Sequence, residues 1–160
     1  MPKVILLCGK IGAGKTTYAR QLMQKNPAIH LSSDDLMLQL FPEPLGDRYD
    51  EVAGRALRYL HEMAARIVTA GLDVILEGAA WKRADRLKSS SFFRERGIPF
   101  EWHYIDITAE AWRAHIEARN RDVEKGKSGA YYVDERLLEK CLEMFEEPRE
   151  DEVDVYVLNE

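Results

Sequence analysis

The segment Gly9-Lys10-Ile11-Gly12-Ala13-Gly14-Lys15-Thr16 fits the pattern G-x-x-x-x-G-K-[ST] at every fixed position. An apolar run over residues 4–8 precedes it, and a helical pattern follows it from residue 15. This order of strand, loop and helix is the context in which the pattern indicates a phosphate-binding loop. Glycines let the backbone curl so that successive N–H groups point at one centre, and the helix N-terminus adds its dipole there. We therefore expect the loop to bind the phosphates of a nucleoside triphosphate.

Individual residues of this loop have separate expected tasks. Lys15 can reach the terminal phosphates, and the hydroxyl of Thr16 can hold Mg²⁺. The backbone N–H groups of residues 11–17 are expected to surround the phosphate oxygens. The predicted nucleotide-binding residues of the loop are Gly9, Gly12, Ala13, Gly14, Lys15, Thr16 and Thr17.

Length and composition limit the classes of protein to which the chain can belong. At 160 residues it is expected to form one domain over residues 1–160. A formal net charge of -5 argues against a general duplex-DNA binder or a protein of anionic membrane surfaces. The two cysteines do not make a disulfide framework. The sequence shows no signal peptide and no transmembrane run, so we expect a cytoplasmic protein with no membrane partner.

Apolar runs alternate with helical patterns along the chain, which is typical of an α/β fold with a parallel sheet. The sequence predicts strands over residues 3–8, 29–32, 72–77, 100–107 and 153–158. It predicts helices over residues 15–25, 33–40, 50–70, 82–96, 109–123 and 134–146, with a loop at 41–46. Parallel sheets bind ligands at the carboxyl ends of their strands, where the phosphate loop lies.

Two adjacent carboxylates, Asp34 and Asp35, follow the second predicted strand. Phosphoryl transfer needs a group that orients the attacking hydroxyl and accepts its proton, and a carboxylate beside the γ-phosphate can do this. The alternative is that one of the aspartates only caps the helix that begins there. Both interpretations can hold at once, because there are two aspartates.

Residues 3–36 resemble the P-loop kinases that include the phage polynucleotide 5′-kinase domain, chloramphenicol phosphotransferase and the zeta toxins, many of whose relatives are described as AAA-family ATPases or predicted kinases. The resemblance rests on the loop up to Thr17, on Tyr18-Ala19-Arg20, on Asn26-Pro27 and on Asp34-Asp35. It implies a three-layer P-loop fold with strand order 2-3-1-4-5, ATP and Mg²⁺ as cofactors, and an aspartate that acts as base. By position that base is Asp34, which is also a candidate metal ligand, with Asp35 as second choice.

The resemblance also implies a lid, here over about residues 119–133, that covers the bound nucleotide. Arg119-Asn120-Arg121 lies where such kinases carry lid arginines, so Arg119 and Arg121 are candidate catalytic residues and Arg119 a candidate nucleotide ligand. Arginine suits this task because its planar fork of donors matches a spread negative charge. The alternative is a solvated helix end, where basic residues also favour the dipole.

The third predicted strand ends at Glu77, which could bind Mg²⁺ through water or have only a structural role. Trp81, Lys82 and Arg83 follow, and with Asp35 they are the candidate acceptor-binding residues. Trp81 is equally typical of an ordinary partly buried tryptophan at a helix start. The four histidines, His30 among them, show no metal-ligand spacing and are interpreted as structural.

These features favour a kinase that moves the γ-phosphate of ATP to a hydroxyl of a small molecule. The first alternative is a polynucleotide or nucleotide 5′-hydroxyl kinase, which predicts a basic groove near Lys82, Arg83 and Arg86. Polynucleotide kinase carries a basic residue three positions after its aspartate, where this chain has Met37, and this departure weakens that alternative. The second alternative is a nucleotide-dependent regulatory ATPase that binds a protein partner.

Overall fold

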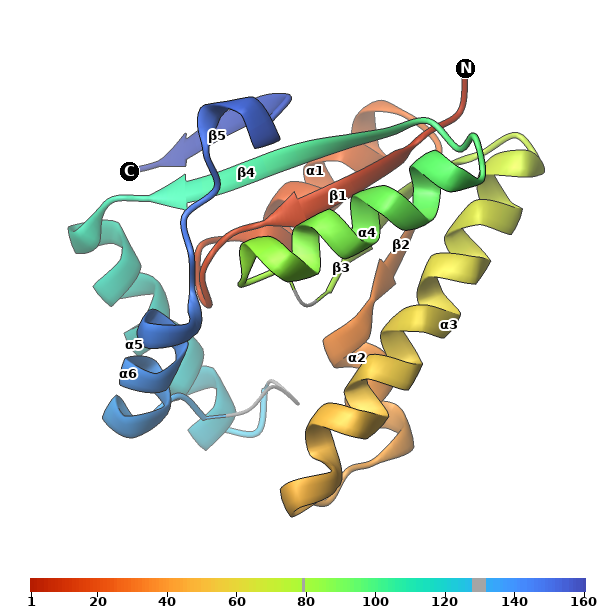
Figure 1. Ribbon diagram of the computed structural model, residues 1–160. Coiled ribbons are helices and arrows are strands. Elements are labelled where there is room, and N and C mark those ends of the chain that lie inside the picture. The colour runs from red at the N-terminus through yellow and green to blue at the C-terminus, as the bar shows by residue number, and fades with distance from the viewer. Residues whose placement is uncertain (79, 128–131) are drawn as a thin grey trace.

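Five parallel strands form the sheet of this protein, in the order β2-β3-β1-β4-β5 (Figure 1). The structure is a computed structural model, and residues 1–78, 80–127 and 132–160 are described. The strands are β1 (Val4–Cys8), β2 (Ala28–Ser32), β3 (Asp73–Glu77), β4 (Phe100–Ile107) and β5 (Val155–Asn159). This arrangement confirms the predicted α/β class and the strand order that the resemblance implied.

Strand β1 lies at the centre of the sheet, and all five of its residues are buried. It pairs on one side with β3, where Val4 faces Val74, and on the other with β4, where Val4 faces Phe100. A strand covered on both faces reads as a continuous apolar run, which is the pattern of residues 4–8. The phosphate loop therefore begins at the middle of the carboxyl edge of the sheet.

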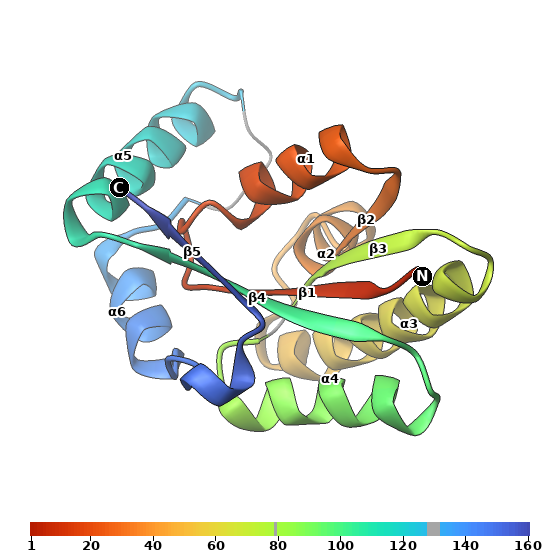
Figure 2. The ribbon, with the colours of Figure 1, turned by 90° about the horizontal axis from the view of Figure 1, so that it is seen from above.

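Helices cover both faces of the sheet (Figure 2). They are α1 (Lys15–Lys25), α2 (Ser33–Leu40), α3 (Tyr49–Thr69), α4 (Arg83–Glu95), α5 (Ala109–Glu124) and α6 (Glu135–Met144), with 3-10 turns at Gly46–Arg48 and Glu150–Glu152. None of the helices in the described residues has the length and apolar character that crossing a membrane requires.

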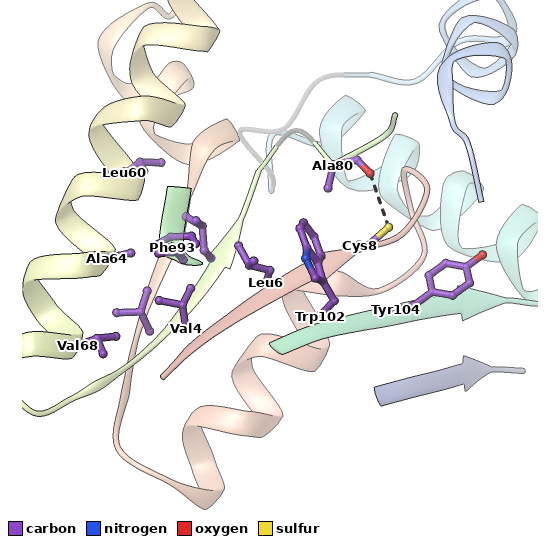
Figure 3. Packing of buried hydrophobic residues seen from close by; sticks show 12 residues of the cluster. Val4, Leu6, Cys8, Leu60, Ala64, Val68, Ala80, Phe93, Trp102 and Tyr104 are labelled. Atoms are coloured by element: carbon purple, nitrogen blue, oxygen red, sulfur yellow. Dashed lines mark hydrogen bonds between the residues drawn. The ribbon is translucent and has the colours of Figure 1, made fainter. Parts of the chain in front are cut away.

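Successive residues of β1 point to opposite faces and so divide the core in two. Val4, Leu6 and Cys8 pack on one face with residues of α3 and α4, as Figure 3 shows for Leu60, Ala64, Val68 and Phe93. Ile5 and Leu7 pack on the other face with residues of α1 and α5, namely Ala19, Trp112 and Ile116. The result is a helix–sheet–helix sandwich whose carboxyl edge carries the loops.

Most predicted boundaries lie within one or two residues of those observed, and two segments differ. The predicted loop at 41–46 is followed by a 3-10 turn over Gly46–Arg48 that leads directly into α3. Helix α6 ends at Met144 instead of residue 146, because Phe145 adopts an extended backbone. Its ring packs beside that of Tyr104, with 6.3 Å between the ring centroids, and this core contact ends the helix.

Candidate active site

A cleft of about 1810 Å³ lies at the carboxyl edge of the sheet. Its walls include the phosphate loop, the start of α2, the end of β3 and Arg119 of α5. Pockets for one small ligand usually measure about 300–1,000 Å³. The cleft is therefore large enough for a nucleotide and a second substrate side by side.

Several backbone N–H groups of the phosphate loop have no backbone acceptor among the described residues. Gly12 and Gly14 have φ angles of 74° and 100°, which is the left-handed region that glycine tolerates. Among the described residues no backbone acceptor faces the N–H groups of Gly12, Gly14, Lys15, Thr16 and Thr17. Unpaired N–H groups at a helix N-terminus form an anion site.

The side chain of Lys15 contacts the first residue of the loop. Its Nζ donates a hydrogen bond of 2.6 Å to the carbonyl oxygen of Gly9, the first residue of the loop. Gly9 in turn touches β4, since a Cβ there would lie 2.5 Å from the Ile105 carbonyl oxygen. The lysine is thus held inside the loop that it is predicted to serve.

Three oxygen donors that were predicted to hold the metal ion, from Thr16, Asp34 and Glu77, line the same cleft. The Thr16 hydroxyl donates to the Glu77 carboxylate at 3.1 Å from Oε1 and 3.3 Å from Oε2. Hydroxyl and carboxylate oxygens are the ligands that Mg²⁺ prefers. This donor set therefore fits Mg²⁺.

The carboxylate of Glu77 is held from its other side by His30 of β2. The two atoms Nε2 of His30 and Oε2 of Glu77 are 2.9 Å apart, and both side chains are largely buried. Burial raises the pKa of Glu77, but the His30 hydrogen bond and the charge of Lys15 outweigh it and bring the pKa below its ordinary value. Glu77 is therefore an anion at neutral pH. The sequence indicated a structural role for His30, and its contact with Glu77 was not predicted.

Asp34 lies in the first turn of α2 and does not cap that helix. The N-cap is Ser32, whose Oγ accepts the N–H of Asp35 at 3.3 Å. Asp34 is a solvent-exposed residue that lines the cleft, and the protein atoms packed around its carboxylate raise its pKa. The charges of Lys15 and Arg119 oppose this rise, while that of Glu77 adds to it. The Asp34 carboxylate, at the start of α2 beside the phosphate loop, is therefore not used as a helix cap.

The predicted acceptor-binding residues divide into two groups. Asp35, Trp81 and Lys82 line the cleft, whereas Arg83 does not. The backbone N–H of Arg83 donates to Glu146 Oε2 at 3.2 Å, and its side-chain Nε is buried without a partner among the described residues. The structure thus brings three of these four residues to the site.

The two candidate lid arginines also separate. Arg119 lines the cleft, and its buried Nε has no hydrogen-bond partner among the described residues. Arg121 is exposed on α5 and is not part of the cleft wall. The predicted lid over residues 119–133 includes residues 128–131, which lie outside the described residues. Its two flanks are joined, because Asn120 and Val133 exchange hydrogen bonds of 2.7 and 2.8 Å.

Comparison with known proteins assigns the sequence to a family. The AAA domain family matches residues 4–148 of the chain. No match to the sequence was found among curated proteins.

Several solved kinases have the same fold as this chain. An APS kinase of Mycobacterium tuberculosis, solved with AMPPNP and APS, is 19% identical with a TM-score of 0.68, over 99% of this chain and 89% of that one. An unliganded sugar kinase of Janibacter sp. is 22% identical with a TM-score of 0.63, over 99% and 86%. A gluconokinase of Sinorhizobium meliloti is 17% identical with a TM-score of 0.62, over 98% and 81%.

At these identities the likeness concerns the fold, which is that of P-loop kinases, and the match over residues 4–148 decides the family. This chain belongs to the AAA domain family.

Proposed function

We propose that the protein is an ATP-dependent phosphotransferase that moves the γ-phosphate of ATP to a hydroxyl group of a small molecule, with Asp34 as the base. The observation that supports it most directly is the Asp34 carboxylate, which lines the same cleft as the phosphate loop and is not used as a helix cap. A nucleotide switch needs no such carboxylate, whereas phosphoryl transfer to a hydroxyl does.

In the proposed reaction the acceptor oxygen forms a bond to the γ-phosphorus while the bond from that phosphorus to the β,γ-bridging oxygen breaks. The proton of the acceptor hydroxyl passes to the Asp34 carboxylate. Lys15 and the N–H groups of residues 11–17 hold the phosphates, and Arg119 meets the charge that spreads over the transferred group. A lid over residues 119–133 would bring Arg119 to the nucleotide and exclude water.

Mg²⁺ would be held by Thr16, with Glu77 and Asp34 on the same side of the cleft. When bound it neutralises phosphate charge and orients the phosphate oxygens. The Glu77 carboxylate, fixed by His30, keeps the hydroxyl of Thr16 in the cleft at 3.1 Å.

The surroundings of Arg86 favour a small acceptor over a polynucleotide. The basic groove predicted for the polynucleotide kinase requires Lys82, Arg83 and Arg86 on one surface. Arg86 is only 3% exposed and is paired with Glu152 at 3.1 Å, so it is not available to a nucleic acid backbone. The formal net charge of -5 points the same way.

The test is transfer of labelled γ-phosphate from ATP, with Mg²⁺, to a panel of nucleosides, sugars, aminoglycosides, chloramphenicol-like alcohols and 5′-hydroxyl oligonucleotides. Asp34→Asn removes the base but keeps the size of the side chain. We expect it to bind ATP with near-normal affinity and to lose about 10²- to 10⁴-fold in transfer rate. Lys15→Ala, which removes the phosphate contact, should lose both binding and transfer.

Two results would count against this proposal. Normal transfer by Asp34→Asn would show that another group accepts the proton, with Asp35→Asn as the next variant. ATP binding without transfer to any acceptor, together with nucleotide-sensitive capture of a protein, would favour the regulatory ATPase.

A further inference from the structure

We propose that Trp112, His115 and Asn159 are positioning residues that set the phosphate loop in its binding conformation before the nucleotide arrives. The proposal rests on the phosphate site of the proposed function and not on the acceptor. We call these three residues the loop brace. They lie outside the loop, on α5 and at the end of β5, and no motif in the sequence marks them as site residues.

The loop brace binds three consecutive carbonyl groups of the phosphate loop. The indole Nε1 of Trp112 donates to the Ile11 carbonyl oxygen at 2.7 Å. The carbonyl oxygen of Gly12 accepts from Nδ1 of His115 at 3.1 Å.

The third carbonyl of the row, that of Ala13, accepts from Nδ2 of Asn159 at 2.7 Å. Because a carbonyl oxygen can only accept, Nδ1 of His115 carries a proton. Three donors from two elements thus fix one short run of backbone.

Fixing these carbonyls also fixes the direction of the next N–H groups. A trans peptide unit is planar, and its C=O and N–H point in opposite directions. With the Ile11 carbonyl turned toward Trp112, the N–H of Gly12 faces the other side. The Asn159 contact has the same effect on the N–H of Gly14. Neither N–H has a backbone acceptor among the described residues, so both are free for phosphate oxygens.

The middle peptide has a different task. This peptide joins the Gly12 carbonyl, which His115 holds, to the Ala13 N–H. The Ala13 N–H donates to the Lys10 carbonyl oxygen at 3.1 Å. Together with the φ of 74° at Gly12, this bond closes a tight turn at the start of the loop. His115 therefore supports the turn, while the other two residues aim the donors.

Two glycines of the loop motif lie directly against this support. A Cβ at Gly12 would lie 2.6 Å from Cδ1 of Ile116 and 3.6 Å from Nε1 of Trp112. A Cβ at Gly14 would lie 2.8 Å from Nδ2 of Asn159. Glycine is thus needed here for close approach as well as for its positive φ.

The loop brace is itself anchored in the fold. The Thr108 N–H donates to the carbonyl oxygen of Asn159 at 3.0 Å, and the Trp112 N–H donates to that of Thr108 at 2.9 Å. The Trp112 ring is 9% exposed, and Lys10 Nζ lies 4.3 Å from its centroid. A loop held in this way loses little freedom when the phosphates bind, which is how preorganisation improves affinity.

The test measures binding of inorganic pyrophosphate with Mg²⁺ by calorimetry, on the full-length protein, without an acceptor. Trp112→Phe keeps an aromatic ring and removes the donor, together with the five-membered ring that carries it. We expect a roughly threefold to tenfold weaker affinity for pyrophosphate, the range expected for one lost hydrogen bond. Asn159→Ala, at a half-buried position, should give a similar loss and provides a second variant if Trp112→Phe fails to fold.

Trp102→Phe is the matched control. The Nε1 of Trp102 also donates a buried hydrogen bond, to Ser90 Oγ at 2.8 Å, but on the opposite face of the sheet. It should lower the melting temperature and leave pyrophosphate affinity unchanged.

Equal pyrophosphate affinity for Trp112→Phe, Asn159→Ala and wild type would overturn the proposal. If wild type binds pyrophosphate and phosphorylates nothing, the proposed function fails while the loop brace is still tested.

Discussion

Glu77 shows how one side chain can depend on a neighbour far away in the sequence. Its carboxylate meets the Thr16 hydroxyl on one side and the His30 ring on the other. The His30 contact fixes the direction of the carboxylate, in the way that residues outside a metal site commonly orient the ligands within it. His30 therefore belongs to the metal side of the proposed site, although it does not line the cleft.

Replacing His30 should change the Mg²⁺ requirement of the reaction. In His30→Ala the Glu77 carboxylate loses its partner, and we expect a roughly tenfold higher Mg²⁺ concentration for half-maximal transfer, since residues that orient metal ligands commonly contribute 10- to 100-fold in affinity. His30→Gln retains an N–H donor and should recover part of the loss. A Mg²⁺ titration at saturating ATP measures both variants. Unchanged Mg²⁺ dependence in His30→Ala would show that Glu77 needs no support.

The difference between Asp34 and His30 shows what the sequence can reveal about single residues. Asp34 follows a predicted strand at the edge where the phosphate loop lies, so the topology alone brings it to the site. His30 lies within a strand, and its contact with Glu77 spans 47 residues. No local pattern marks such a pair, because it depends on the register that places Ser32 beside Glu77 in the sheet.

The contact between α3 and α4 contains a buried histidine. His61 of α3 is hydrogen-bonded to Ser89 of α4 at 3.1 Å and stacks on Phe92, with 5.2 Å between ring centroids. Burial, and to a lesser degree the charge of Arg96, lowers the pKa of His61 to about 4. This histidine is neutral in the folded protein at pH 7.

This lowered pKa predicts acid sensitivity of the folded state. Between pH 6.5 and 4 the unfolded chain binds a proton at His61 that the folded protein does not, so stability falls as the pH drops. A shift from 6.5 to about 4 corresponds to about 2 kcal/mol of lost stability between pH 7 and pH 5. Urea unfolding of wild type and His61→Gln at both pH values measures it. An equal loss of stability in the variant would assign the effect to His103, because burial lowers the pKa of that histidine as well.

Helices and strands were the most predictable part of the structure. Helix α1 and strand β4 have the predicted bounds, because a proline follows one and bulky residues fill the other. The predicted end of α6 was wrong by two residues. The helical pattern of the sequence continues through Phe145, but the ring of Phe145 packs against the core and its backbone leaves the helix. The local periodicity of a sequence contains no information about a contact with a distant strand.

Arg86 joins parts of the chain that are distant in sequence. Its Nη1 donates to the carbonyl oxygens of Ala80 and Glu146, both at 2.9 Å, and its Nε donates to Glu152 at 3.1 Å. The segment after β3, which leads to the acceptor side of the cleft, is thereby tied to the segment before β5.

Breaking this junction should destabilise the whole protein. Arg86→Met takes the Arg86 donors away from Glu152 and from the three carbonyl groups of Ala80, Trp81 and Glu146, and we expect a loss of about 3–5 kcal/mol, as for a broken buried ion pair. Arg55→Met is the control, because Arg55 makes an exposed pair with Glu51 at 2.7 Å and should change stability by less than about 0.5 kcal/mol. Urea unfolding measures the free energy of unfolding of both variants. Equal effects would mean that Arg86 contributes no more than a surface pair.

Strand order was obtainable only through resemblance. Alternating elements predict a parallel sheet, but the placement of β1 between β3 and β4 follows from no local feature of residues 4–8. The prediction that Arg86 lines a basic groove was wrong for a similar reason, because local sequence features do not show contacts between distant segments. Its spacing from Lys82 suits a shared helix face, while the acid that pairs with it lies 66 residues away.

The Asn159 contact has a consequence for synthesis on the ribosome. The loop motif is translated before β5, and the side chain that holds its Ala13 carbonyl follows 146 residues later. A nascent chain therefore exposes the motif long before its third support exists, and pairing over such a sequence separation forms slowly. If Asn159 has the proposed role, the loop gains about threefold to tenfold in phosphate affinity once β5 has joined the sheet. Capture on an immobilised nucleotide would accordingly select chains that have finished folding over stalled or truncated ones.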